Sequence, residues 1–106
     1  MGDDMTNQAI EEFKTQVLIL LDAIPAGQII SYGELARQAG RSGYARQVGY
    51  LLKNLPNDTR LPWHRVVNSQ GKISFNEGSD AFMKQKILLE QEGWILVKST
   101  LIRKNQ

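Results

Sequence analysis

Residues 30–55 read ISYGELARQAGRSGYARQVGYLLKNL and predict two short helices joined by a turn that contains glycine. Ser31 and Glu34 form a capping-box pattern, in which each side chain satisfies a free amide of the first helical turn. The first helix should therefore begin here and run to about Gln38, with Gly40 as the left-handed residue beyond its end. Two short helices with this connection are typical of a helix-turn-helix.

The second helix of this pair offers a candidate DNA-binding face. We expect Ser42 to cap its start and Pro56 to stop it. Arg46, Tyr50 and Lys53 are spaced by four and three residues and fall on one side, which makes them candidates for DNA contact. A mixture of Arg, Tyr and Lys also fits an ordinary solvated helix face, and the pattern alone leaves both interpretations open. The opposite, apolar side carries Val48, Leu51, Leu52 and Leu55.

Two further helices are expected on either side of this pair. Apolar residues recur at intervals of three and four over residues 10–24, which predicts a helix capped by Thr6 or Asn7. Ser79 can cap a last helix over residues 80–92. The side chains of this last helix expected to face inward are Phe82, Met83, Ile87, Leu88 and Leu89.

Short extended segments complete the expected fold. Residues 61–67 read as a stiff loop that enters a strand, residues 68–71 as a turn and residues 72–75 as the returning strand. Residues 94–97 form a last extended piece. We therefore expect a mostly α fold with a small β-hairpin, a winged-helix-like helix-turn-helix domain.

Composition narrows the possible chemistry. The chain has 106 residues, one His and no Cys, which excludes disulfides, thiolate catalysis and Cys-type zinc sites, so we expect no metal and no cofactor. This length suits one domain over residues 1–106, with flexible ends at 1–6 and 98–106. The longest apolar run, residues 17–21, is far too short for a signal sequence or a membrane span, so we expect a cytoplasmic protein without membrane contact.

Charge is distributed unevenly along the chain. The net charge is +2, but residues 1–33 carry −4 and residues 34–72 carry +5. A basic middle indicates an anion-binding face, and a solvated Arg-rich surface is the alternative.

The run Pro62-Trp63-His64-Arg65-Val66 sets an aromatic ring, the one imidazole and a guanidinium behind a rigid proline. A lone His is more often structural than catalytic. Glu92, however, falls in the last turn of its helix, where the helix dipole disfavours a negative charge. A cationic or N–H partner would account for this placement, and solvent exposure is the alternative.

Four blocks in this order resemble the O6-alkylguanine-DNA alkyltransferases: residues 30–36, 45–49, 62–66 and 91–93. The third block is similar to the family signature Pro-Cys-His-Arg-Val, with Trp63 at the position of the alkyl-accepting Cys. Indole does not displace an alkyl group from guanine at neutral pH, and the chain has no other Cys to take over the reaction. The resemblance therefore implies a non-enzymatic, alkyltransferase-like member of the family.

Such a member is expected to bind double-stranded DNA containing O6-alkylguanine, to flip the damaged nucleotide and to flag it for nucleotide excision repair proteins. We expect a monomer, because no dimerisation helix is evident. The resemblance implies a helix-turn-helix in the minor groove, with Arg46 as the finger that fills the vacated stack. The lesion pocket it implies comprises Tyr32, Trp63, His64, Val66 and Glu92. The DNA-binding residues we expect are Arg41, Ser42, Ala45, Arg46, Tyr50, Lys53 and Arg65.

Two other functions fit the same sequence. The chain could be an active-site variant of a true methyltransferase in which Trp63 replaces the reactive Cys. A helix-turn-helix transcription regulator that reads undamaged DNA in the major groove is the second alternative.

Overall fold

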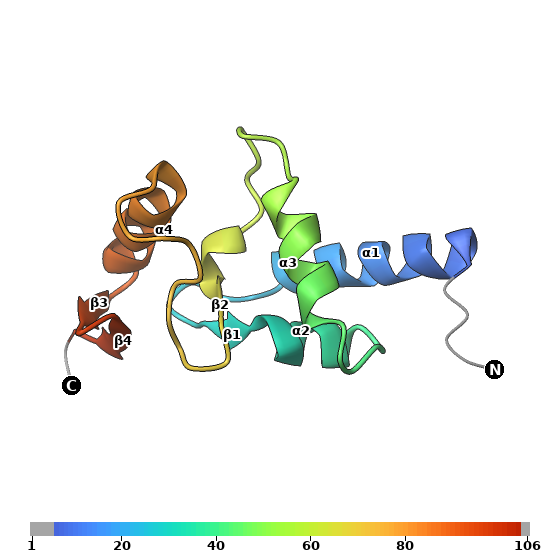
Figure 1. The fold of residues 1–106 in the computed structure, drawn as a ribbon, viewed down its shortest axis with the longest axis horizontal. Coiled ribbons are helices and arrows are strands. Elements are labelled where there is room, and N and C mark those ends of the chain that lie inside the picture. Colours follow the sequence, from blue (N-terminus) through green and yellow to red (C-terminus); the bar gives the residue numbers. More distant parts are fainter. Residues whose placement is uncertain (1–5, 105–106) are drawn as a thin grey trace. The chain divides into compact units, whose positions relative to one another are not determined.

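A computed structural model describes residues 6–104 and divides them into two compact units (Figure 1). The first unit comprises the described residues up to Ala23 together with Tyr32–Leu61, and the second comprises Ile24–Ser31 and the described residues from Pro62 onward. The elements, in chain order, are α1 (Asn7–Asp22), β1 (Ile30–Ser31), α2 (Tyr32–Gln38), α3 (Ala45–Lys53), the short 3-10 helix η1 (Trp63–Arg65), β2 (Val66–Val67), α4 (Asp80–Gln91), β3 (Trp94–Val97) and β4 (Thr100–Arg103).

The first unit is built from α1, α2 and α3, which pack on one another. The Thr6 hydroxyl accepts a hydrogen bond from the Ala9 amide at 3.0 Å and so caps α1, as the sequence predicts. Helix α2 ends at Gln38, also as predicted. The buried apolar side chains of this unit are Phe13, Val17, Leu21, Leu35, Ala36 and Val48. The predicted helix-turn-helix pair is thus confirmed.

The start of α3 differs from the prediction. Ser42 is exposed and does not cap this helix, whose N-cap is Tyr44, with no side-chain capping hydrogen bond. The physical reason is an additional turn, in which Gly43 adopts a φ of +89° and the Tyr44 amide donates to the Arg41 carbonyl at 3.1 Å. The chain therefore enters the helix two residues later than a Ser42 cap requires.

The second unit holds two small sheets and α4. Strands β1 and β2 pair in parallel, with Ile30 opposite Val66 and Ser31 opposite Val67. Strands β3 and β4 pair antiparallel. The buried cluster of this unit contains Val67, Ile73, Phe82, Leu89 and Leu101. Parallel pairing of β2 with β1 fixes the segment that follows η1.

The small hairpin lies at another place than predicted. Residues 72–75 do not form a strand. The Asn68 side chain accepts hydrogen bonds from the amides of Gln70 and Lys72, which closes the predicted turn over residues 68–71 and occupies the Lys72 amide that a strand would need. The antiparallel hairpin is instead β3–β4, and part of the expected flexible end at residues 98–106 forms β4. Residues 1–5 and 105–106, which complete the two expected flexible ends, lie outside the described residues, and the single domain over residues 1–106 stays a prediction.

Helix α4 begins where predicted but turns a different face inward. Ser79 Oγ accepts from the Phe82 amide at 3.1 Å and caps it. Phe82 and Leu89 are buried as expected, whereas Met83 and Ile87 are 45% and 47% exposed, so the prediction for these two is wrong. Gln85 takes the intervening buried position. The reason is that α4 carries two adjacent apolar stripes, one with Met83 and Ile87 and one with Phe82 and Leu89. Packing within the second unit buries the second stripe, which also contains Gln85.

No helix within residues 6–104 is both long enough and apolar enough to span a bilayer.

Candidate functional site

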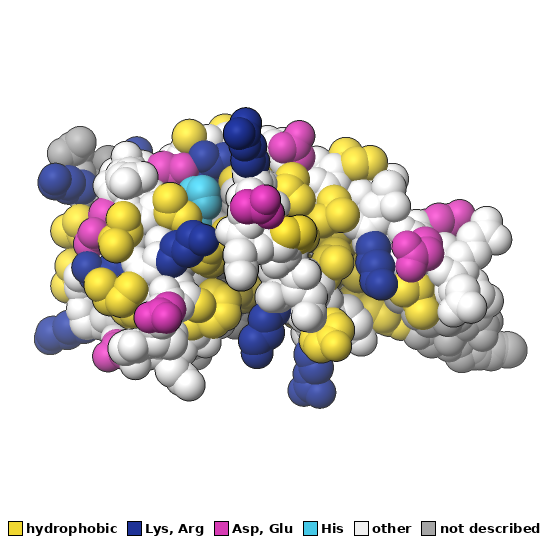
Figure 2. Space-filling view, turned by 90° about the horizontal axis from the view of Figure 1, so that it is seen from above, with side chains coloured by type: hydrophobic (Ala, Val, Ile, Leu, Met, Phe, Trp, Pro, Cys, Tyr) yellow, Lys and Arg dark blue, Asp and Glu magenta, His cyan; other side chains and the backbone are white. Residues whose placement is uncertain are grey.

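The outer face of α3 presents polar and aromatic side chains to solvent. Arg46, Tyr50 and Lys53 are all exposed, and Tyr50 is 72% exposed, while Val48 on the opposite side is fully buried. On the face drawn in Figure 2, Lys and Arg side chains are scattered among apolar ones and do not merge into one basic patch. An exposed aromatic ring four residues from an arginine suits stacking against nucleic acid as well as charge attraction.

Tyr32, at the start of α2, lies against α3 at a glycine. A Cβ added to Gly49 would lie 3.8 Å from two ring carbons of Tyr32, so the ring occupies the surface that this glycine leaves open. Gly49 follows Arg46 by three residues, which is close to one helical turn. The Tyr32 ring therefore packs on α3 about one helical turn after Arg46.

The remaining candidates of the first unit lie before or at the start of α3. Arg41 is half-buried, with its guanidinium 5.8 Å from the centre of the Tyr44 ring. Ser42 is exposed, and Ala45 is half-buried in the first turn of α3.

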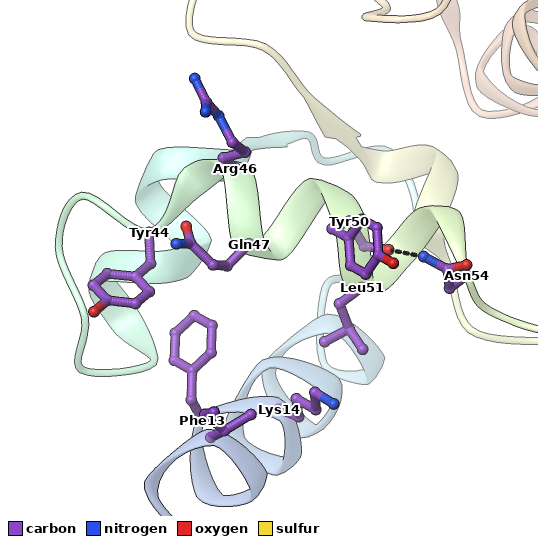
Figure 3. A pocket seen from close by; sticks show the side chains of 9 residues that line it. Phe13, Lys14, Tyr44, Arg46, Gln47, Tyr50, Leu51 and Asn54 are labelled. Atoms are coloured by element: carbon purple, nitrogen blue, oxygen red, sulfur yellow. Dashed lines mark hydrogen bonds between the residues drawn. The ribbon is translucent and has the colours of Figure 1, made fainter. Parts of the chain in front are cut away.

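A hollow of about 620 Å³ lies between α1 and α3 (Figure 3). Its aromatic wall includes Phe13 and Tyr44, whose rings meet edge to face at 5.7 Å. Figure 3 shows the Arg46 side chain extending away from Phe13, and the Asn54 amide donating to the Tyr50 carbonyl at 2.8 Å. The sequence pattern does not predict this hollow, because it follows from how two helices are spaced. The lining residues are Ile10, Phe13, Lys14, Tyr44, Arg46, Gln47, Tyr50, Leu51 and Asn54.

In the second unit, the Trp63–Arg65 turn carries the candidate pocket residues. Trp63 is half-buried, and its ring meets Phe75 edge to face at 6.2 Å. His64 is 8% exposed. Phe75 was not predicted as a site residue, because residues 72–75 were expected to form a strand and instead form an irregular segment.

Glu92, at the C-cap of α4, is the centre of a hydrogen-bonded cluster. Its carboxylate lies 2.9 Å from His64 Nε2 and accepts from Arg65 Nη2 at 2.6 Å and from the Gly27 amide at 3.1 Å. Of the two explanations that the sequence left open for Glu92, solvent exposure or a cationic or N–H partner, the structure shows the second. Arg65, a predicted DNA-binding residue, also donates to the Ile24 carbonyl at 2.6 Å, so its guanidinium is engaged within this unit.

This cluster keeps Glu92 ionised. Partial burial by itself raises the pKa of the carboxyl, but hydrogen bonds from Arg65, His64 and Gly27 outweigh it and lower the pKa from 4.5 to about 2. Glu92 is therefore a carboxylate at neutral pH. It can orient the imidazole of His64, but the chain has no thiol for such a pair to activate.

The main chain of the same turn is held from α4. Gln85 is fully buried, and its side-chain amide donates to the carbonyls of His64 and Val66, at 3.0 Å each. Val66 is itself fully buried, and its amide donates to the Trp63 carbonyl. Gln85 was not predicted as a buried residue, because the sequence pattern gives no sign that this polar side chain faces inward.

The structure thus brings together His64, Arg65 and Glu92, with Trp63 and Val66 on the same turn and strand. Tyr32, the other predicted pocket residue, belongs to the first unit. Across residues 6–104, no three His, Cys, Asp or Glu side chains gather in a way that suits a metal ion.

Comparison with known proteins adds independent information. Residues 12–94 match the family model of the 6-O-methylguanine DNA methyltransferase, DNA binding domain. A DNA base-flipping protein of Vibrio parahaemolyticus is 49% identical over 84 residues, which is 79% of this chain and 82% of that protein. Alkyltransferase-like protein 1 of Schizosaccharomyces pombe is 44% identical over 92 residues, with 87% and 85% covered. The crystal structure of S. pombe Atl1 in complex with damaged DNA containing O6-carboxymethylguanine matches with a TM-score of 0.76 and 41% identity over 90% of each chain.

Proposed function

The chain belongs to the alkyltransferase-like branch of the 6-O-methylguanine DNA methyltransferase family, and from this premise we propose that it binds O6-alkylguanine in duplex DNA without removing the alkyl group. The observation that carries the proposal is the similarity, over 90% of both chains, to Atl1 bound to O6-carboxymethylguanine DNA, in a chain without cysteine. Recognition is retained and the thiol chemistry is absent. In this proposal the damaged nucleotide rotates out of the stack, as the name of the Vibrio relative describes for that protein.

Flipping assigns a task to the α2–α3 pair. Extruding a nucleotide costs a few kcal/mol, and less when the base already pairs poorly, so an alkylated guanine is selected in part by this difference. Arg46 is exposed on α3 and can fill the vacated place, where it stacks on neighbouring bases and stays close to phosphates. Tyr32, packed against Gly49, is positioned on the same pair to contact the rotating nucleotide.

The Trp63–Arg65 turn supplies the proposed base pocket. We infer from the similarity of residues 62–66 to the family signature that Trp63 replaces the alkyl-accepting Cys of the enzymes, and its half-buried ring beside Phe75 offers an aromatic surface for the extruded base. Such stacking contributes roughly 1–3 kcal/mol per base. His64 and Glu92 then act as a structural pair that fixes this turn.

We further propose that the bound lesion is a signal for nucleotide excision repair proteins and that the protein acts as a monomer. A binder that holds a lesion without repairing it serves the cell only if another activity removes the damage. The exposed residues of the chain therefore include a contact surface for a damage-recognition protein of that pathway.

One set of measurements tests the proposal. Affinity is measured at matched salt for three duplexes of one sequence that carry guanine, O6-methylguanine or a bulkier O6-alkylguanine. We expect both lesions to be preferred, and intact-protein mass spectrometry of the same samples to show no added alkyl mass. Equal affinity for all three duplexes would argue for a general DNA binder or a transcription regulator, and an alkylated protein would show a transfer reaction.

A further inference from the structure

Gln85 is a fully buried polar side chain in the second unit that the proposed function has not used. Its amide nitrogen is 3.0 Å from the carbonyl oxygens of both His64 and Val66. Both neighbours are acceptors, so only the nitrogen of the amide can face them. The Gln85 Oε1 atom is also buried and has no hydrogen-bond partner among the described residues.

Two donated hydrogen bonds beside an acceptor without a partner indicate that the Gln85 amide orients the main chain more than it stabilises the fold. Each hydrogen bond it donates adds modestly to stability, whereas a buried acceptor without a partner carries a desolvation penalty that offsets the gain. The two bonds do fix the orientation of two peptide groups, those that follow His64 and Val66. They flank the point where η1 ends and β2 begins.

Helix α4 thereby holds the turn at two places, separated by seven residues, or about two helical turns. Gln85 holds the main chain through the two carbonyls, and Glu92 holds the side chains of His64 and Arg65. Leu89, fully buried, lies between them on the same face. Because a three-residue 3-10 turn has weak hydrogen bonds of its own, its geometry depends on such external contacts.

We propose that Gln85 is a specificity-determining positioning residue, which sets the main chain of the turn so that Trp63 presents its ring to an extruded base. This inference rests on the proposed function, since it concerns the same lesion site. Gln85 does not contact the base in this scheme. It acts through the His64 and Val66 carbonyls, and its contribution is the preference for damaged over undamaged DNA.

The test compares Gln85→Met, which keeps the side-chain length and removes both donors, with Gln85→Lys, whose ammonium group again offers donors to the two carbonyls. Gln91→Met, an exposed position on the same helix, is the matched control. The readout is the ratio of dissociation constants for the guanine and O6-methylguanine duplexes. We expect Gln85→Met to lower this ratio by about tenfold, with affinity for undamaged DNA changed by less than about twofold.

Gln85→Lys should retain most of the preference, and Gln91→Met all of it. An NMR spectrum adds a readout that separates positioning from general loosening: in Gln85→Met the indole N–H signal of Trp63 should shift or broaden while that of Trp94 stays unchanged. If Gln85→Met does not fold, Gln85→Leu, which also lacks hydrogen-bond donors and adds no buried charge, replaces it in the comparison.

The proposal is overturned if the variant without donors keeps the lesion preference, or if the Met and Lys variants lose it equally. A wild-type protein that does not distinguish the two duplexes would instead refute the proposed function. The wild-type measurement therefore separates failure of the function from failure of the role of Gln85.

Discussion

His64 Nε2 lies 2.9 Å from Glu92 Oε2, although 28 residues separate the two in the chain. The carboxylate also accepts hydrogen bonds from Arg65 and from the Gly27 amide. In an enzyme, an oriented imidazole–carboxylate pair can move a proton, but this chain has no cysteine to receive the effect. The pair instead ties the η1 turn to the end of α4 and to the segment before β1. These contacts fix the position of the η1 turn, and their strength depends on the negative charge of Glu92.

Acid should therefore weaken the fold through Glu92. Its pKa is lowered from 4.5 to about 2, so the stabilisation is complete above pH 4.5 and is lost as the pH falls toward 2. With allowance for partial solvent screening, we expect Glu92→Gln to lower the free energy of unfolding by about 1–2 kcal/mol at pH 7. Denaturant unfolding between pH 2 and 7 should show a flatter acid limb for this variant than for the wild type.

The control for the acid limb is Glu34→Gln, because Glu34 has a pKa of about 2 as well, lowered by hydrogen bonds from Arg37 and Gln38. Glu34 is on an exposed helix face and should contribute less to the acid limb than Glu92. Parallel acid limbs for Glu92→Gln and the wild type would contradict the prediction.

Arg46→Ala should affect DNA binding and leave stability almost unchanged. The side chain is exposed on the outer face of α3. The free energy of unfolding should therefore change by less than about 0.5 kcal/mol. Loss of the group that fills the vacated stack should weaken binding to an O6-methylguanine duplex by about tenfold or more, as measured by fluorescence anisotropy.

Arg60→Ala, an exposed arginine in the loop after α3, provides the comparison. It removes the same charge without removing a residue of the α3 face. An equal loss of lesion preference in both variants would show that charge alone accounts for the effect of Arg46.

Features encoded by neighbouring residues were predictable from the sequence. The cap of α1 by Thr6 and the cap of α4 by Ser79 involve groups three residues apart, and both patterns gave the correct helix start. For both caps the physical cause acts within a few residues. The position of Glu92 at a helix C-terminus pointed to a partner or to solvent exposure, and the sequence did not decide between them.

Features decided by tertiary packing were not predictable in this way. Met83 and Ile87 are as apolar as the buried residues of α4, and only the packed structure selects the stripe that contains Gln85. Strand β4 depends on pairing with β3. The predicted turn over residues 68–71 is confirmed, and only the returning strand expected after it is absent. The contact of Phe75 with Trp63 was also not predictable, because it depends on the path of residues 72–75, which were expected to form a strand.

The buried face of α4 differs from the one expected, and this difference leads to a stability prediction. Leu89 is fully buried, so Leu89→Ala should lower the free energy of unfolding by about 2–5 kcal/mol. Ile87 is 47% exposed, and Ile87→Ala should lower it by less than about 1 kcal/mol. Urea unfolding at neutral pH distinguishes the two. A larger effect at residue 87 than at residue 89 would contradict the burial of these two side chains in the structure.

The two tryptophans separate lesion recognition from folding. Trp63 is half-buried beside Phe75, and removal of its ring by Trp63→Ala should weaken binding to an O6-methylguanine duplex by roughly 1–3 kcal/mol, because a stacking surface is lost. Affinity for the undamaged duplex should stay close to that of the wild type.

Trp94 packs against the core of the second unit, with the Arg103 guanidinium 5.0 Å from the centre of its ring. Trp94→Phe should therefore reduce stability and leave the lesion preference intact. Titration of both duplexes at one salt concentration, together with thermal unfolding of each variant, measures the two effects, and a lesion preference that survives Trp63→Ala would remove the indole from the proposed pocket.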